Sequence, residues 1–317
     1  MVCSRRSVLV ALSVALAGCR RDTRKVIGVV PQGRSHMFWQ SVHAGAVAAE
    51  RETGVEVLWN GPASETDYNG QLQIIEAMIN RRVDAIAVSP NDRTAMVGVV
   101  ERAAREKIPV IIFDSPIDTE AYVTRVATDN YQAGRLGASR MGKILGGKGT
   151  VAIVAVRPGG ASSMLREQGF EDGIRQRFPG IAIVDKRYGL ADFAKSMEVT
   201  ENMLTAHPDL SALFASNESS TVGAARALKS RHGKAKLVGF DSSPALIEDL
   251  KSGLIDSLIV QDPFRMGYES VMAAVKTLRG ENLPKANDLP PTLVTVANLN
   301  TPEVQRLLNP DLKKYLD

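Results

Sequence analysis

The sequence predicts an α/β protein built as two doubly wound parallel-sheet lobes, and three observations lead to this fold class. Short β-branched apolar runs alternate with helical stretches along most of the 317 residues, as in parallel strands joined by right-handed crossover helices. The first run, Val26–Val30, has no polar break, which is typical of a strand buried on both faces. The alternation pauses near residues 128–130 and then starts again, and the chain is long enough for two domains.

The first series of elements runs from residue 26 to residue 127. Its predicted strands are 26–30, 55–59, 84–88, 109–113 and 122–127. Its predicted helices are 37–50, 67–82 and 94–106. The second of these helices has the spacing of an amphipathic helix, with one apolar face formed by Leu72, Ile75, Met78 and Ile79.

The second series begins after Thr128-Asp129-Asn130 and repeats the same pattern. Its predicted helices are 131–145, 162–178, 192–206, 221–230, 244–252 and 264–279. Its predicted strands are 149–154, 181–188, 210–216, 236–240, 257–260 and 292–296. Residues 281–291 contain three prolines and no apolar period, which predicts a return linker, and the residues after 296 are expected to form an irregular tail.

Residues 1–18 predict a signal peptide of a bacterial lipoprotein. Arg5 and Arg6 precede a short apolar segment, Ser7–Ala15, which is too short to span a bilayer. Leu16-Ala17-Gly18-Cys19 then matches a lipobox, so we expect lipid on Cys19, a tether at residues 19–24, and an exported protein anchored at the periplasmic or cell surface. The pair of arginines leaves the general and the twin-arginine export routes both open.

Charge and cysteine content argue against several classes of function. Without residues 1–18, 37 of the 39 basic residues remain against 35 acidic residues, and this balance of +2 is too small to indicate nucleic-acid binding. Cys3 leaves with the signal peptide and Cys19 takes the lipid, so no cysteine remains for a disulfide, a thiolate nucleophile or a metal site. The four histidines are scattered without metal-ligand spacing, and we expect neither a metal nor a cofactor.

Polar residues follow several predicted strands at the point where each strand ends. They are Ser89, Asp114, Asn217, Asp241 and Gln261. A single polar residue at such a place is usually a turn or a helix cap, but open α/β sheets bind ligands at the carboxyl ends of their strands. Phe38 and Trp39 follow the first strand, where they could be core residues or a stacking surface for a ligand. The set as a whole favours one shared ligand site.

The residue types in this set favour a sugar or a polyol. Carboxylates and amides bind vicinal hydroxyl groups, an arginine donates in a fork, and flat aromatic rings cover the apolar face of a sugar. Asp114 and Asp241 could instead form a glycosidase pair, but hydroxyl binding is favoured and no enzyme is expected. The loop Arg157–Gly160 could bind an anion, although a flexible loop is the simpler interpretation.

The chain resembles the periplasmic sugar-binding proteins of ABC importers, of the ribose-binding type, which share their fold with the core of lactose-repressor-type regulators. The resemblance spans residues 25–296. Its motifs are Thr128-Asp129-Asn130, Arg166-Glu167-Gln168-Gly169-Phe170, Ala206-His207-Pro208-Asp209, Ala212-Leu213-Phe214-Ala215, Val238-Gly239-Phe240-Asp241 and Gln261-Asp262-Pro263. It implies a type I periplasmic binding protein whose lobes are joined by a three-stranded hinge. The implied lobes are residues 25–128 with 262–290, and residues 129–261 with 291–317.

The resemblance also implies the residues that contact the ligand. They are His36, Phe38, Trp39, Ser89, Asp114, Ser115, Arg166, Phe193, Asn217, Asp241 and Gln261. The implied function is to bind a monosaccharide or related polyol between lobes that close on it, and to deliver it as a monomer to an ABC permease. The alternative is a binding protein that feeds a chemoreceptor or a sensor kinase.

Three positions depart from the ribose-binding pattern. Ser115 stands where ribose binders carry an arginine, Ser89 stands where they carry an asparagine, and His36 replaces another asparagine. Because a site built around particular hydroxyl groups rejects mismatched sugars strongly, we predict that ribose is not the best ligand.

Overall fold

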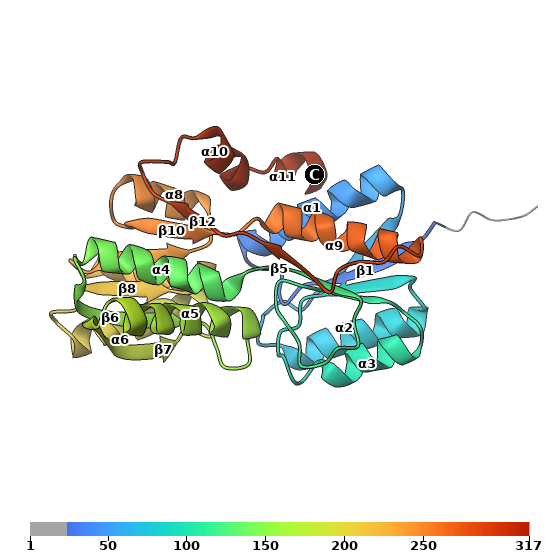
Figure 1. Ribbon diagram of the computed structural model, residues 1–317, viewed down its shortest axis with the longest axis horizontal. Helices are drawn as coiled ribbons and strands as arrows, with labels where there is room; N and C mark the ends of the chain where they lie inside the picture. Colours follow the sequence, from blue (N-terminus) through green and yellow to red (C-terminus); the bar gives the residue numbers. More distant parts are fainter. Residues whose placement is uncertain (1–23, 317) are drawn as a thin grey trace, which may run out of the picture.

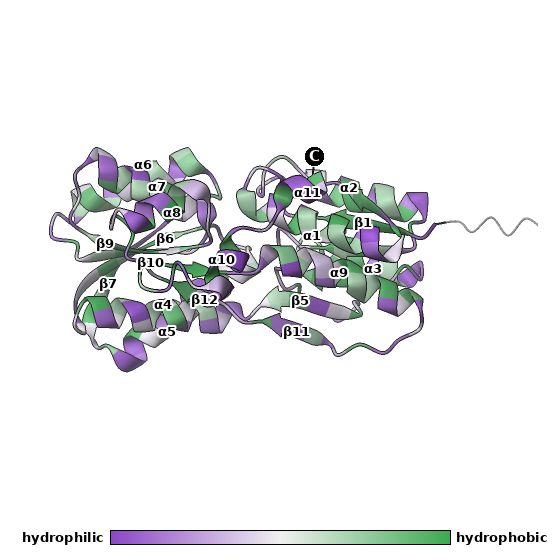
Figure 2. Cartoon of the chain, turned by 90° about the horizontal axis from the view of Figure 1, so that it is seen from above, coloured by the Kyte–Doolittle hydropathy of each residue, from purple (hydrophilic) through white to green (hydrophobic). Residues whose placement is uncertain are grey.

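The computed structural model describes residues 24–316 and contains two α/β lobes, which confirms the predicted fold class (Figure 1). Each lobe has a six-stranded sheet with helices on both faces. Figure 2 shows apolar strands in the middle of each lobe, between helices that carry polar residues on their outer surfaces. Within residues 24–316 there is no helix with the length and apolar character needed to cross a bilayer.

The first lobe is organised around the sheet order β11-β5-β4-β3-β1-β2, in which all neighbours are parallel. Its strands are β1 (Val26–Val30), β2 (Glu56–Trp59), β3 (Ala85–Val88), β4 (Val110–Phe113), β5 (Thr124–Thr128) and β11 (Ala286–Leu289). Its helices are α1 (Met37–Thr53), α2 (Tyr68–Arg81), α3 (Val97–Arg105) and α9 (Pro263–Leu278). Alternate residues of the strands pack against α1 and α9 on one face and against α2 and α3 on the other.

The second lobe repeats this plan with the order β12-β10-β9-β8-β6-β7, in which only β12 is antiparallel. Its strands are β6 (Lys148–Ala155), β7 (Gly180–Tyr188), β8 (Ala212–Ala215), β9 (Lys236–Phe240), β10 (Ser257–Val260) and β12 (Thr292–Val294). Its helices are α4 (Asn130–Ile144), α5 (Ala161–Arg177), α6 (Phe193–Ala206), α7 (Glu218–Ser230), α8 (Pro244–Lys251) and α10 (Pro302–Leu308). Helices α4 and α5 cover one face, and α6, α7 and α8 cover the other.

The chain passes between the lobes three times. It crosses between β5 and α4, between β10 and α9, and between β11 and β12. The first two crossings touch, because the Thr128 hydroxyl donates to the Gln261 side-chain oxygen at 2.8 Å. Three short connections of this kind form a hinge that keeps the lobes together while it lets their relative angle change.

Two predictions for the C-terminal part of the chain were wrong. Residues 281–291, expected to be a linker, contain β11, and the expected irregular tail contains α10 and α11 (Leu312–Leu316). Strand β11, Ala-Asn-Asp-Leu, has no apolar run to mark it, and α10 and α11 are too short to show a helical period. Helix α11, assigned to the second lobe in the sequence analysis, lies against α1 of the first lobe, where Arg51 donates to the Lys314 carbonyl oxygen at 2.6 Å (Figure 1).

Glycine sets the distance between α1 and α9 in the first lobe. A Cβ on Gly45 would overlap the Phe264 carbonyl oxygen, and a Cβ on Gly267 would overlap the Val42 carbonyl oxygen. The two helices therefore touch backbone to backbone, and no side chain larger than hydrogen fits at these positions.

We predict that Gly45→Ala lowers the free energy of unfolding by about 1–3 kcal/mol, because overpacking at a helix contact forces the backbones apart. The control is Gly98→Ala on α3, where the added Cβ meets no atom within 4 Å. It should be neutral or slightly stabilising, since alanine is the better helix former. Urea denaturation of both variants measures this, and equal stability of the two would contradict the prediction.

Candidate functional site

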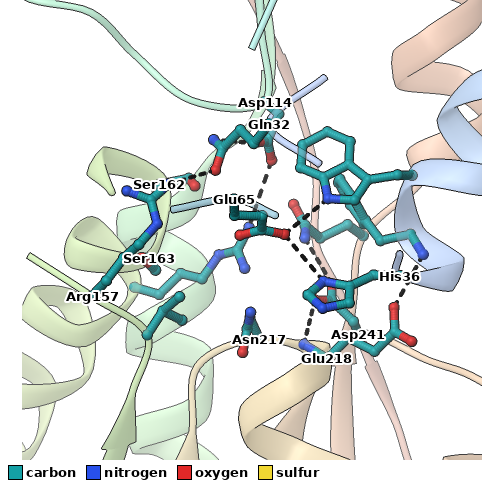
Figure 3. Close-up of a pocket in the computed structure, with 15 residues that line it drawn as sticks. Gln32, His36, Glu65, Asp114, Arg157, Ser162, Ser163, Asn217, Glu218 and Asp241 are labelled. Atoms are coloured by element: carbon teal, nitrogen blue, oxygen red, sulfur yellow. Dashed lines mark hydrogen bonds and ion pairs between the residues drawn. The ribbon is translucent and has the colours of Figure 1, made fainter. Parts of the chain in front are cut away.

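A cavity lies between the two lobes, at the carboxyl ends of both sheets (Figure 3). In this closed arrangement the side chains nearly fill it, and the remaining cavity volume is about 30 Å³, room for one or two water molecules. Its lining residues are Gln32, His36, Phe38, Trp39, Glu65, Asp114, Val156, Arg157, Ser162, Ser163, Arg166, Asn217, Glu218, Asp241 and Gln261. They come from loops that follow β1, β2, β4, β6, β8, β9 and β10, or from the first two turns of the helices after them.

Two aspartates occupy equivalent places in the two lobes. Asp114 follows β4 and Asp241 follows β9, the fourth strand of each series, and both have a left-handed backbone with φ of 57° and 65°. Such a conformation is costly for a non-glycine residue and is concentrated at functional sites. Burial raises the pKa of Asp114 to about 7 and also raises the pKa of Asp241. Both carboxyl groups are therefore placed to exchange hydrogen bonds with ligand hydroxyl groups.

Arg166 of α5 is the cation nearest to these aspartates. Its guanidinium lies 3.9 Å from an Asp114 oxygen and stacks 4.1 Å above the centre of the Phe240 ring. It also donates to the Asn130 side-chain oxygen at 2.7 Å and to the Ser216 carbonyl oxygen at 3.1 Å. These contacts fix the guanidinium before any ligand arrives, so little side-chain entropy is lost on binding.

His36, Glu65 and Trp39 form a buried polar cluster at one side of the cavity (Figure 3). Glu65 lies 3.1 Å from the His36 Nδ1 and accepts from the Trp39 indole N–H at 2.9 Å. Burial acts against both charges, but the hydrogen bond and the charge of Glu65, aided by Glu218 and Asp241, raise the pKa of His36 to about 9. Burial likewise opposes ionisation of Glu65, yet His36, Arg157 and Trp39 lower the pKa of Glu65 to about 2. The pair is ionised across the neutral range.

Glu218 joins the lobes at the start of α1. The N-cap residue of α1, His36, makes no side-chain capping bond, and the Glu218 carboxylate from the other lobe accepts from the Met37 and Phe38 backbone N–H groups at 3.3 and 3.1 Å. A carboxylate at a helix N-terminus satisfies free donors and complements the helix dipole. This cap exists only while the lobes are together.

The structure brings most of the predicted site residues into the cavity. Those that line it are His36, Phe38, Trp39, Asp114, Arg166, Asn217, Asp241 and Gln261. Trp39 and Phe38 meet edge to face at 4.8 Å, and both belong to the hydrophobic core of the first lobe. Both also line the cavity, and their stacking on a ligand stays a prediction.

Three predicted residues do not line the cavity. Ser89 is fully buried behind it and donates to Asp114 at 2.9 Å, and the space beside Ser89 is filled by the Gln32 side chain, which donates to Ser89 at 3.1 Å. Ser115 is also fully buried and accepts from the Ser162 backbone N–H at 3.3 Å. Phe193 lies behind His36, with ring centroids 5.1 Å apart.

Sequence reasoning missed several lining residues: Gln32, Glu65, Val156, Arg157, Ser162, Ser163 and Glu218. Gln32 lies two residues after β1, and Glu218 follows the predicted site residue Asn217. Their closeness to these strand ends was the only sequence signal that they belong to the site. Nothing in the sequence places Glu65 beside His36. For the loop Arg157–Gly160 the sequence left anion binding open and favoured a flexible loop, but the Arg157 side chain is 1% exposed. Within the described part of the chain, no group of three histidine, cysteine or acidic residues is close enough to hold a metal ion.

Comparisons with known proteins show the family of the chain. Residues 27–282 match a family described as periplasmic binding protein domain. The ribose import binding protein of Bacillus subtilis (strain 168) is 28% identical over 269 residues, which cover 85% of this chain and 87% of that protein.

Solved structures of sugar complexes are also similar. An ABC transporter solute-binding protein from Agrobacterium vitis, bound with α-D-tagatopyranose, has a TM-score of 0.87 at 28% identity and covers 91% of this chain and 100% of its own. A carbohydrate transporter solute-binding protein from Agrobacterium radiobacter, in complex with D-arabinose, has a TM-score of 0.88 at 33% identity, with the same coverage.

The His36–Glu65 pair predicts a pH dependence of folding stability. A histidine whose pKa rises from 6.5 to about 9 on folding stabilises the fold fully below pH 6.5, and this contribution is lost as the pH rises through about 9. The stability difference between wild type and His36→Gln should therefore shrink by up to about 3 kcal/mol between pH 6 and pH 10. Urea denaturation at the two pH values measures it, and a constant difference would contradict the ionised pair.

The Glu218 contact predicts that this side chain favours the closed state. Loss of a helix cap costs about 1 kcal/mol, so Glu218→Ala should shift the lobes toward the open form. Small-angle scattering should show a larger radius of gyration than for Glu198→Ala, which removes an exposed carboxylate from α6 of the same lobe. Identical scattering from the two variants would mean that the cap does not bias closure.

Proposed function

The chain belongs to the periplasmic binding protein family, and we propose that its cleft takes a monosaccharide or a related polyol. It is the extracytoplasmic solute-binding protein of a sugar ABC importer. The observation that carries the ligand assignment is the meeting of Asp114 and Asp241, from equivalent strand ends of the two lobes, with Arg166 between them and the rings of Phe38 and Trp39 beside them. Polar planar groups bind vicinal hydroxyls, and aromatic rings cover the apolar face of a sugar.

The mechanism is closure of the two lobes about the hinge. The three crossings are the only covalent links between the lobes within residues 24–316, and the cavity wall is complete only when both lobes contribute. Ligand binding then holds the lobes together, and the closed form presents a surface to the membrane permease. The family consists of sugar-binding transport proteins, and in this proposal the protein makes and breaks no covalent bond.

Ribose is not the preferred ligand in this proposal. The similar proteins bind different sugars by their descriptions, including ribose, α-D-tagatopyranose and D-arabinose. Here His36 is held by Glu65, and Ser89 and Ser115 bond to other protein groups and do not line the cavity. A site with so many buried polar groups discriminates strongly against sugars that leave one of them unpaired.

Transport is favoured over sensing by the relatives, which are import proteins by their descriptions. As a member of a family of periplasmic binding proteins of importers, the chain is exported. We further propose that it acts as a monomer and is anchored through a lipid on Cys19, which lies outside the described residues. A lipid anchor keeps a binding protein close to its permease.

The ligand assignment predicts a thermal-shift response to one or a few sugars. A ligand at a hundred times its dissociation constant adds about 2.7 kcal/mol to the free energy of unfolding, which raises the melting temperature of residues 20–317 by several degrees. A screen of pentoses, hexoses and polyols measures this. Asp241→Ala and Trp39→Ala should abolish the response, and Glu198→Ala should keep it. A wild-type protein that responds to no sugar or polyol would overturn the assignment.

The anchor proposal predicts that Cys19→Ser releases the protein from membranes. In a bacterial host, the wild-type chain should partition into detergent and carry an N-terminal diacylglyceryl cysteine detectable by mass spectrometry. The Cys19→Ser chain should stay in the aqueous phase, while Cys3→Ser should behave as wild type because residue 3 is removed with the signal. Aqueous partitioning of the wild type would contradict the proposal.

A further inference from the structure

Arg157 is a buried cation that forms no ion pair with any carboxylate among residues 24–316. Its side chain is 1% exposed, and it lines the cavity from the loop that follows β6. Its Nη2 donates to the Gln32 side-chain oxygen at 2.8 Å, across the cleft, whereas its Nε and Nη1 are buried without an acceptor within residues 24–316. Glu65 and Asp92 lie close enough to be influenced by its charge, but neither makes an ion pair with it.

An arginine in this state is costly for the protein alone. A guanidinium stays charged at all ordinary pH values, and burial of a charge without a bonded counter-group is strongly unfavourable. The remaining donors of the group are directional and fixed in a plane. The cost is recovered if the ligand itself supplies oxygen acceptors to Nε and Nη1.

The surroundings of Arg157 hold it at one end of the cavity, beside Gln32 and Ser162 (Figure 3). The Tyr68 ring of the first lobe lies 5.7 Å from the guanidinium carbon, and Gln32 connects Arg157 to the Asp114 carboxyl group at 3.2 Å. Ser162, in the first turn of α5, donates its backbone N–H to Ser115 of the first lobe. The loop after β6 therefore brings a guanidinium from the second lobe to the end of the cavity beside Gln32 of the first lobe.

We propose that Arg157 determines ligand specificity by donating from Nε and Nη1 to a pair of ligand oxygens. The oxygens belong either to a carboxylate, as in a uronate or an aldonate, or to two neighbouring hydroxyl groups of a neutral sugar. This inference rests on the proposed function and adds to it the chemistry required at one end of the ligand. Arg166 and the two aspartates then contact the hydroxyl groups at the other positions.

The test measures the affinity of several related ligands for wild type and for two single variants. Isothermal titration is performed with the best neutral sugar from the thermal-shift screen, its uronate or aldonate, and its monodeoxy analogues. Each is measured with wild type, with Arg157→Met, which keeps much of the side-chain volume, and with Gln32→Leu. Gln32→Leu removes the acceptor across the cleft and leaves the guanidinium in place.

If Arg157 contacts the ligand, wild type should bind one member of a matched pair at least about tenfold more tightly, and Arg157→Met should abolish that difference. Tighter binding of the acid identifies a carboxylate, and weaker binding of one deoxy analogue identifies the hydroxyl pair. Gln32→Leu should keep the difference even where it lowers all affinities.

If wild type binds sugars and Arg157→Met weakens the binding of every ligand by the same factor, Arg157 acts only in closure of the lobes and the inference is wrong. If wild type binds no ligand of the panel, the proposed function itself fails.

Discussion

The constraint on which this structure depends is the burial of ionisable groups where the carboxyl ends of two parallel sheets meet. Each lobe places charged side chains at its strand ends. A buried charge is costly unless it is paired or hydrogen-bonded, so these side chains need polar partners. Many of their partners belong to the opposite lobe: Glu218 caps α1, Arg157 donates to Gln32, and Ser162 donates to Ser115. The closed arrangement is thus stabilised by polar contacts that an open form would exchange for water.

The ionisable groups that line the cavity influence one another's charge. Glu65 and His36 neutralise each other, as their pKa values of about 2 and about 9 indicate. Burial raises the pKa of Glu218 to about 7, but both Glu218 oxygens accept from the N–H groups at the start of α1. Burial also raises the pKa of Asp114 to about 7, so this group is partly protonated near neutral pH and can donate as well as accept. Hydroxyl groups have the same dual character, which makes a polyhydroxylated ligand compatible with the cavity in either protonation state.

Much of the fold and part of the site could be predicted from the sequence, because both rest on local patterns. Unbroken apolar runs such as Val26–Val30 indicate strands that are buried on both faces. Polar residues such as Asp114 and Asp241 follow such runs and so indicate the ends of the strands. Strand β11 has no apolar run to mark it, since three of its four residues are at least partly exposed, and the seven residues of α10 are too few to show a helical period. Glu65 and Arg157 are recognisable only through partners that are distant in sequence, since each reaches the cavity from a loop whose path the local pattern does not fix.

Two kinds of residue line the cavity: those placed by regular elements and those placed by loops. Asp114, Asp241 and Arg166 are placed by strand ends and by the packed helix α5, so the common fold alone determines their positions. Gln32, Glu65 and Arg157 lie on loops, and loops change sequence at little cost to the core. A cavity wall made of both kinds can retain its hydroxyl-binding groups while its loop residues adapt to a new sugar. The loop after β6 is one such place, because it supplies a buried cation with free donors.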